Sequence, residues 1–265
     1  MIDNIIIGKY VPGSTVIHRM DPRAKLLTIF LYVFIVFFAN NGITYFLLGL
    51  FTFIIILLTK LPFSFLWNGL KPVIWIVGFT FLLHILVTKE GDMLFRFGFF
   101  SIYEEGLRQG FFISLRFIFL IFMTTTLTLT TTPIEITDGM ESLLKPFKKF
   151  KLPVHELALM MSISLRFIPT LLEETEKILK AQMARGVDFT SGPVKERIKA
   201  IVPLLVPLFI SAFKRAEELA TAMEARGYRG SEGRTKIRQL KWGAIDSIMM
   251  VSILLLSIIL LLLRA

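Results

Sequence analysis

The segment "VKERIKAIVPLLVPLFISAFKRAEELATAMEARG", residues 194–227, predicts a single helix of more than 30 residues. Pro193 stands immediately before it, and proline is favoured in the first turn of a helix. The first half is apolar and contains Pro203 and Pro207, whereas the second half mixes Glu and Lys with Ala, Leu and Met. The pattern therefore predicts a long helix whose two halves have different surroundings.

The preceding segment repeats this organisation. Residues 154–186, "VHELALMMSISLRFIPTLLEETEKILKAQMARG", again follow a proline and are apolar in the first half, which contains Pro169. Both segments end in Ala-Arg-Gly, where glycine can close the last helical turn and a cation is favoured by the helix dipole. One such cap is common, but two on neighbouring long helices predict two equivalent tips for a partner with two similar subunits. The tip residues are Ala184, Arg185 and Gly186, and Ala225, Arg226 and Gly227.

The amino-acid composition indicates whether the rest of the chain is surrounded by water or by lipid. Of the 265 residues, 54% are hydrophobic, 26 are phenylalanine, and the mean hydropathy is +0.69, well above that of a soluble domain. The first 23 residues are mostly polar, so we expect no cleavable secretory signal. The absence of cysteine excludes disulfides and thiolate metal sites. The net charge of +10 is typical of positive charge kept on the cytoplasmic side of a membrane protein.

Five segments approach the roughly 20 apolar residues that a helix needs to cross a bilayer. Asp21 is expected to cap the first of them, with Pro22 at its first helical position. Alternating phenylalanines at residues 95, 97 and 99 predict a short hairpin between the third and fourth. The sequence therefore predicts an all-α membrane protein with about five transmembrane helices. The segments are Pro22–Asn41, Ile43–Leu61, Pro72–Thr88, Leu107–Thr131 and Ala244–Leu263.

The distribution of Lys and Arg predicts the orientation. Residues 133–241 carry 19 Lys and Arg against 13 Asp and Glu, and the N-terminal arm is also basic. By the positive-inside rule, both are cytoplasmic and the C-terminus is outside the cell membrane. The predicted organisation is an N-terminal arm with four transmembrane helices (1–132), a cytoplasmic domain (133–240) and a C-terminal transmembrane helix (241–265).

The apolar halves of the two long helices are poor candidates for further spans. Residues 201–213 are too few to cross a bilayer, and residues 157–172 include Arg166, which is costly at membrane depth. We therefore expect these halves to lie along the membrane interface or to pack under the spans. A model with seven spans is the alternative.

The opening segment "GKYVPGSTVIHRMDPRAKL", residues 8–26, and the two Ala-Arg-Gly tripeptides resemble the transmembrane T component of energy-coupling factor transporters, a branch of ABC importers. The resemblance covers essentially the whole chain. It implies that residues 133–240 form a coupling domain of three helices, the last two long and crossing. It also implies that the tripeptides containing Arg185 and Arg226 dock on two ABC ATPases, and that a separate membrane-embedded S component binds the vitamin or other micronutrient.

Other functions are less well supported. The chain has no GxxxxGK[ST] phosphate loop, and His18, His84 and His155 lack neighbouring metal ligands. We therefore expect no enzymatic activity, no catalytic or metal site and no cofactor. A solute-conducting permease subunit of a conventional ABC importer is the alternative, but the first three spans contain almost no ionisable residues. Nucleic acid is not an expected partner, because acids are mixed throughout the basic segment.

Overall fold

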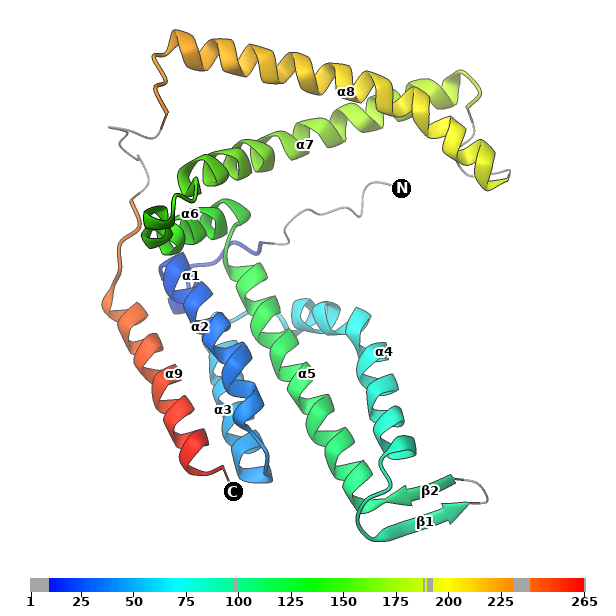
Figure 1. The fold of residues 1–265 in the computed structure, drawn as a ribbon, viewed down its shortest axis with the longest axis vertical. Coiled ribbons are helices and arrows are strands. Elements are labelled where there is room, and N and C mark those ends of the chain that lie inside the picture. The colour runs from blue at the N-terminus through cyan, green and yellow to red at the C-terminus, as the bar shows by residue number, and fades with distance from the viewer. Residues whose placement is uncertain (1–9, 98–99, 188, 190–192, 231–238, 265) are drawn as a thin grey trace. The chain divides into compact units, whose positions relative to one another are not determined.

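The computed structural model describes residues 10–97, 100–187, 189, 193–230 and 239–264. Helices make up most of this part of the chain, and its only strands form one hairpin (Figure 1). The described chain divides into two compact units. One contains residues up to 142 together with those from 240 onward, and the other contains residues 143–239.

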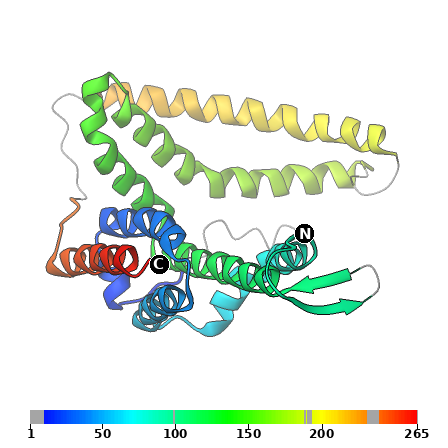
Figure 2. The ribbon, with the colours of Figure 1, turned by 60° about the horizontal axis from the view of Figure 1, so that its bottom comes forward.

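Four neighbouring helices enclose the core of the larger unit. Helices α9, α2 and α3 run side by side in both ribbon views, and α5 packs against α2 and α3 (Figures 1 and 2). Tyr32, Leu48, Met123 and Ile253, one from each helix, are buried together. The elements of this unit are α1 (Val16–Arg19), α2 (Pro22–Ile35), η1 (Val36–Phe38), α3 (Gly42–Thr59), α4 (Phe63–Val87), β1 (Met93–Phe97), β2 (Phe100–Tyr103), α5 (Glu104–Thr130), most of α6 (Pro133–Leu144), and α9 (Ala244–Leu262).

Five helices of the described chain are long and apolar enough to cross a membrane, which agrees with the predicted number. The five helices are not the five predicted ones, because α7 is among them and α2 is not. Helix α2 has only 14 residues before it tightens into the 3-10 helix η1, and together they extend for roughly 27 Å. The fifth qualifying helix is α7 (Val154–Ala184), the least apolar of the five, which the sequence placed in the cytoplasmic domain.

The predicted start of the third span is wrong. Helix α4 begins at Phe63, and Pro72 lies inside it rather than at its start. Proline removes one backbone hydrogen bond and bends a helix without necessarily ending it. The ribbon of α4 is accordingly bent (Figure 1). The fourth span begins slightly earlier than expected, at Glu104.

The predicted hairpin is present between α4 and α5. Strands β1 and β2 pair antiparallel, with Arg96 opposite Ser101 and Phe97 opposite Phe100. Residues 95 and 97 lie in β1 as predicted, and residue 99 lies outside the described part of the chain.

Polar contacts fasten the start of α9 to the start of α2. The Asp21 backbone N–H donates to Asp246 Oδ1 at 2.8 Å, and the Gly243 N–H donates to Asp246 Oδ2 at 2.7 Å. Asp21 caps α2, as predicted, by accepting from the Arg23 N–H at 2.9 Å. Burial alone would raise the pKa of Asp21, but the hydrogen bonds and charge of Arg23 outweigh it and lower that pKa. The cap therefore remains ionised at neutral pH.

Lys25 connects the same end of α2 to the end of α5. This residue is only 5% exposed, and its Nζ donates to the Thr130 carbonyl at 2.9 Å and to Thr131 Oγ1 at 3.1 Å. The opening segment that carried the resemblance thus joins α2 to α5 and α9. Its motif has a structural role in this unit.

The smaller unit contains η2 (Lys145–Phe150), α7 (Val154–Ala184) and α8 (Val194–Ala225). Helix α6, predicted to open the coupling domain, packs on the larger unit, because Gly139 lies against Pro22 and Leu26 of α2. The domain boundaries at residues 133 and 240 remain predictions.

Candidate functional site

Helices α7 and α8 form an antiparallel, crossing pair (Figure 1). At one point of contact, Ser211 Oγ and Arg215 Nη2 both donate to Glu174 Oε1, at 2.8 Å and 3.0 Å. At another, Gln182 Nε2 donates to the Pro203 carbonyl at 3.3 Å. The later residue of α7 meets the earlier residue of α8, so the two chains run in opposite directions.

The prolines of α8 create the second of these contacts. Pro203 and Pro207 are one helical turn apart, and both lie inside a continuous helix. Proline at position 207 has no N–H, so the carbonyl of Pro203 lacks its normal helical donor. The side chain of Gln182 supplies a donor instead. Pro207 therefore opens a specific hydrogen-bonding point for α7 at the Pro203 carbonyl.

The two Ala-Arg-Gly tips have the same backbone geometry. Arg185 has φ −86° and ψ 7°, and Arg226 has φ −86° and ψ 6°. The glycines that follow are left-handed, with φ of 85° at Gly186 and 70° at Gly227. The prediction that glycine closes each helix in this conformation is confirmed.

Each tip closes with the paired hydrogen bonds of a Schellman motif. The Gly186 N–H donates to the Met183 carbonyl at 3.0 Å, and the Val187 N–H donates to the Gln182 carbonyl at 3.1 Å. The second tip repeats both bonds, from Gly227 to Glu224 at 2.8 Å and from Tyr228 to Met223 at 3.0 Å. The side chains of the two arginines therefore project from equivalent helix ends, each in the same direction relative to its own helix.

Both tips are open to a partner. All six residues of the tripeptides are exposed, and no neighbouring atom lies within 4 Å of a Cβ built on Gly186 or Gly227. Within the described residues, neither Arg185 nor Arg226 forms a hydrogen bond or ion pair through its guanidinium. The tips lie at opposite ends of the α7–α8 pair (Figure 1). From Pro203, which contacts α7 beside the first tip, α8 runs 23 residues, or roughly 35 Å, to Arg226.

Replacing Gly186 or Gly227 by Ala should loosen the corresponding tip. A left-handed residue with a Cβ costs about 1–2 kcal/mol, which predicts roughly 5- to 30-fold faster hydrogen exchange at the Val187 or Tyr228 amide. Gly42→Ala is the matched control, since Gly42 opens α3 with open space around its Cβ and without a positive φ. Unchanged exchange in both tip variants would contradict the proposed strain.

Sequence reasoning found the tips but missed how their helices are joined. The Glu174–Arg215 pair links residues far apart in sequence, and no local pattern marks it. The proline pair was noted only as an interruption of α8. A single proline inside a helix frees the carbonyl four residues before it, so Pro207 is the signal that indicates a free carbonyl at position 203.

Comparison with known proteins agrees with this architecture. Residues 13–237 match the family model described as CbiQ, cobalt transport protein. The energy-coupling factor transporter transmembrane protein EcfT of Bacillus subtilis is 72% identical over 265 residues, the whole of both chains. The EcfT proteins of Listeria innocua and Exiguobacterium sibiricum are each 55% identical, over 265 and 260 residues, and cover at least 98% of both chains. The chain belongs to the CbiQ/EcfT family.

Family membership confirms the resemblance drawn from the opening segment and the two tripeptides. It also agrees with a multi-pass membrane protein that acts in transport. The permease alternative is not favoured, because these relatives are named as transmembrane proteins of energy-coupling factor transporters. The docking role of Arg185 and Arg226 stays a prediction.

Proposed function

We propose that the chain is the energy-coupling membrane subunit of an energy-coupling factor transporter for vitamins or other micronutrients. It links two ABC ATPases to a membrane-embedded S component that binds the substrate, and it has no enzymatic activity of its own. The observation that carries this proposal is the pair of exposed helix ends with the same geometry, each with an arginine whose guanidinium has no partner among the described residues. Two equivalent tips suit two equivalent sockets.

Each arginine is suited to bind an ATPase groove. A guanidinium offers five N–H donors in a planar fork, and a hydrogen bond to a charged acceptor contributes about 1.5–3 kcal/mol. The glycine and alanine beside it leave space for a close approach by the wall of the groove. The partner's groove would thus present a carboxylate or a cluster of carbonyls to the arginine.

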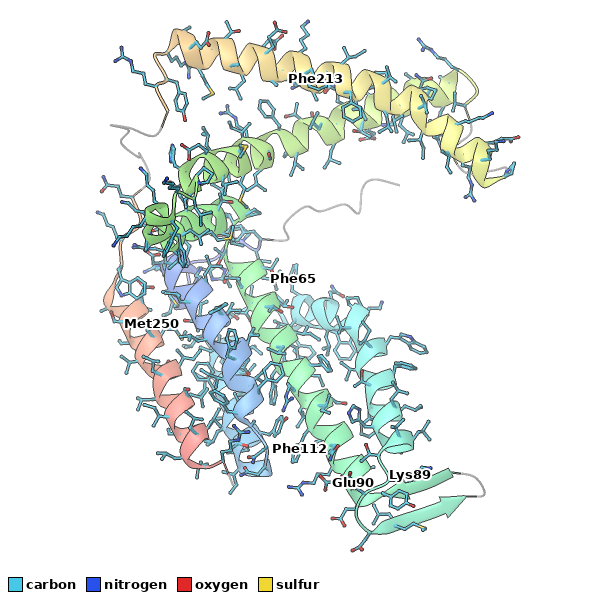
Figure 3. All side chains as sticks on the ribbon, in the orientation of Figure 1. Phe65, Lys89, Glu90, Phe112, Phe213 and Met250 are labelled. Carbon is cyan, nitrogen blue, oxygen red and sulfur yellow. The ribbon has the colours of Figure 1, made fainter. Side chains whose placement is uncertain are left out.

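The apolar half of α8 offers a second surface, suited to the S component. Phe209, Ile210 and Phe213 are 60%, 64% and 72% exposed, and Phe213 is marked on α8 in Figure 3. Such a continuous apolar face on a monomer marks a protein or membrane contact. A membrane-embedded partner would cover this face while the tips remain engaged with the ATPases.

Purification of the affinity-tagged chain from its native membrane should recover these partners. The expected complex holds two ATPase subunits and one further integral membrane protein for each copy of the chain. Quantitative mass spectrometry of the purified complex measures this stoichiometry. Recovery of the chain without any ATPase would overturn the proposal.

The proposed orientation places the N-terminal arm and the α7–α8 pair in the cytoplasm. The chain has no cysteine, so single cysteines introduced at Ser14, Asp92 and Lys195 can be labelled individually in whole cells. An impermeant thiol reagent should label only the position 92 variant, because that site lies in the loop between α4 and α5. Labelling at position 195 would mean instead that α7 crosses the membrane.

A further inference from the structure

A compact basic and aromatic turn follows α6 and leads into α7. Its sequence, "KPFKKFK" at residues 145–151, contains four lysines and no acidic residue. All seven residues are exposed. The 3-10 helix η2 forms most of the turn, and Lys151 closes it with a φ of 63° and an N–H bond to the Lys148 carbonyl at 3.0 Å.

The apolar side chains of this turn are as exposed as its lysines. Phe147 is 47% and Phe150 is 75% exposed, and their ring centroids lie 6.2 Å apart. Leu144 and Leu152, which flank the turn, are 44% and 47% exposed. Four exposed large apolar residues among four lysines form a surface that is both hydrophobic and cationic.

We propose that residues 144–152 bind the anionic headgroup layer of the cytoplasmic leaflet. This inference rests on the proposed orientation of the chain. The phenylalanines would enter the interface between headgroups and acyl chains, while the lysine side chains would reach the lipid phosphates. We call this segment the lipid-binding turn.

The positive charge of the turn favours an anionic lipid surface as its binding partner. The cytoplasmic leaflet carries anionic lipids, and each lysine near its surface strengthens binding by about fivefold. A bilayer also accepts apolar rings at the depth where the phosphates lie. A protein partner would have to provide an apolar patch and several carboxylates within the same small area.

The chain reaches this turn directly from the larger unit. In α6, Gly139 lies against Pro22, the first residue of α2, and only five residues of α6 follow Gly139. The lipid-binding turn is therefore the first segment of the chain that follows this unit.

The test uses the purified full chain without ATPases or S component. Leu152→Cys in this cysteine-free chain is labelled with an environment-sensitive fluorophore and placed in nanodiscs of phosphatidylcholine, alone or mixed with phosphatidylglycerol. In the mixed discs, headgroup-nitroxide lipids should quench the fluorophore strongly at low salt and about twofold less at high salt. Replacing Lys145, Lys148, Lys149 and Lys151 by Gln should reduce the quenching to its level in phosphatidylcholine.

Matched variants separate this contact from a general charge effect. Gln at four lysines of α7 and α8 (Lys177, Lys195, Lys199 and Lys214) should leave the quenching unchanged, whereas Phe147→Ser with Phe150→Ser should reduce it. Equal quenching of the quadruple turn variant and its parent would overturn the proposal, as would quenching of the parent that is the same in the mixed discs and in phosphatidylcholine alone. ATPase co-purification is scored separately, so a failure of the docking proposal is distinguishable from a failure of this one.

Discussion

Replacing Arg185 and Arg226 together by Ala is expected to abolish ATP-driven uptake while the chain remains folded in the membrane. Each guanidinium is exposed and has no partner in the described chain, so its loss removes no internal contact. Each lost charge-assisted bond should weaken docking by about 1.5–3 kcal/mol, or roughly 10- to 150-fold. A single replacement should weaken one ATPase contact, and the double replacement should release both subunits.

Three comparisons make this experiment specific. Arg264→Ala removes an exposed arginine that follows α9 in the other unit, and should leave uptake unchanged. Lys at positions 185 and 226 should restore only part of the activity, because Lys lacks the planar fork of donors. Wild-type uptake by the double Ala variant, with both ATPases still bound, would show that the tips dock through other groups.

The sequence was most informative where structure depends on neighbouring residues. A glycine after the last helical arginine has few alternatives to a left-handed cap, and both tips adopt it. The apolar runs likewise indicated helices α3, α5 and α9 to within a few residues. Pro72 gave the wrong start for α4, because proline is compatible with both the first turn and the bent interior of a membrane helix.

Contacts between distant segments could not be predicted in the same way. Asp246 stands near the start of the last apolar segment, but its bond to the Asp21 N–H depends on how α2 and α9 pack. The same holds for Glu174 and Arg215, whose pairing sets where α7 and α8 cross. Hydrophobic periodicity specifies which face of a helix is buried, but it does not specify the partner.

Residues 216–226 form the last part of α8, which we call the arm. Making the arm more flexible is expected to uncouple ATP hydrolysis from uptake. Among the described residues, Arg215 makes the last side-chain hydrogen bond of α8 with α7, and Arg226 lies eleven residues further on, about 16 Å away along the helix. By contrast, Arg185 lies only three residues beyond the Gln182–Pro203 bond. Under the proposed docking, movement of the ATPase at the α8 tip would reach the crossing only through the stiffness of this part of α8.

A substitution set can change this stiffness without changing the length of the arm. Glu217, Glu218 and Thr221 are exposed on the arm, and replacing all three by Gly should cost about 3 kcal/mol of helix stability relative to replacing all three by Ala. Both triple variants lose the same side chains, so only backbone stiffness separates them. ATPase co-purification should survive in both, whereas uptake measured in proteoliposomes should be lost only in the Gly variant. Equal uptake by the two would mean that α8 acts as a tether, and that force reaches the membrane through α7 and its contact at Pro203.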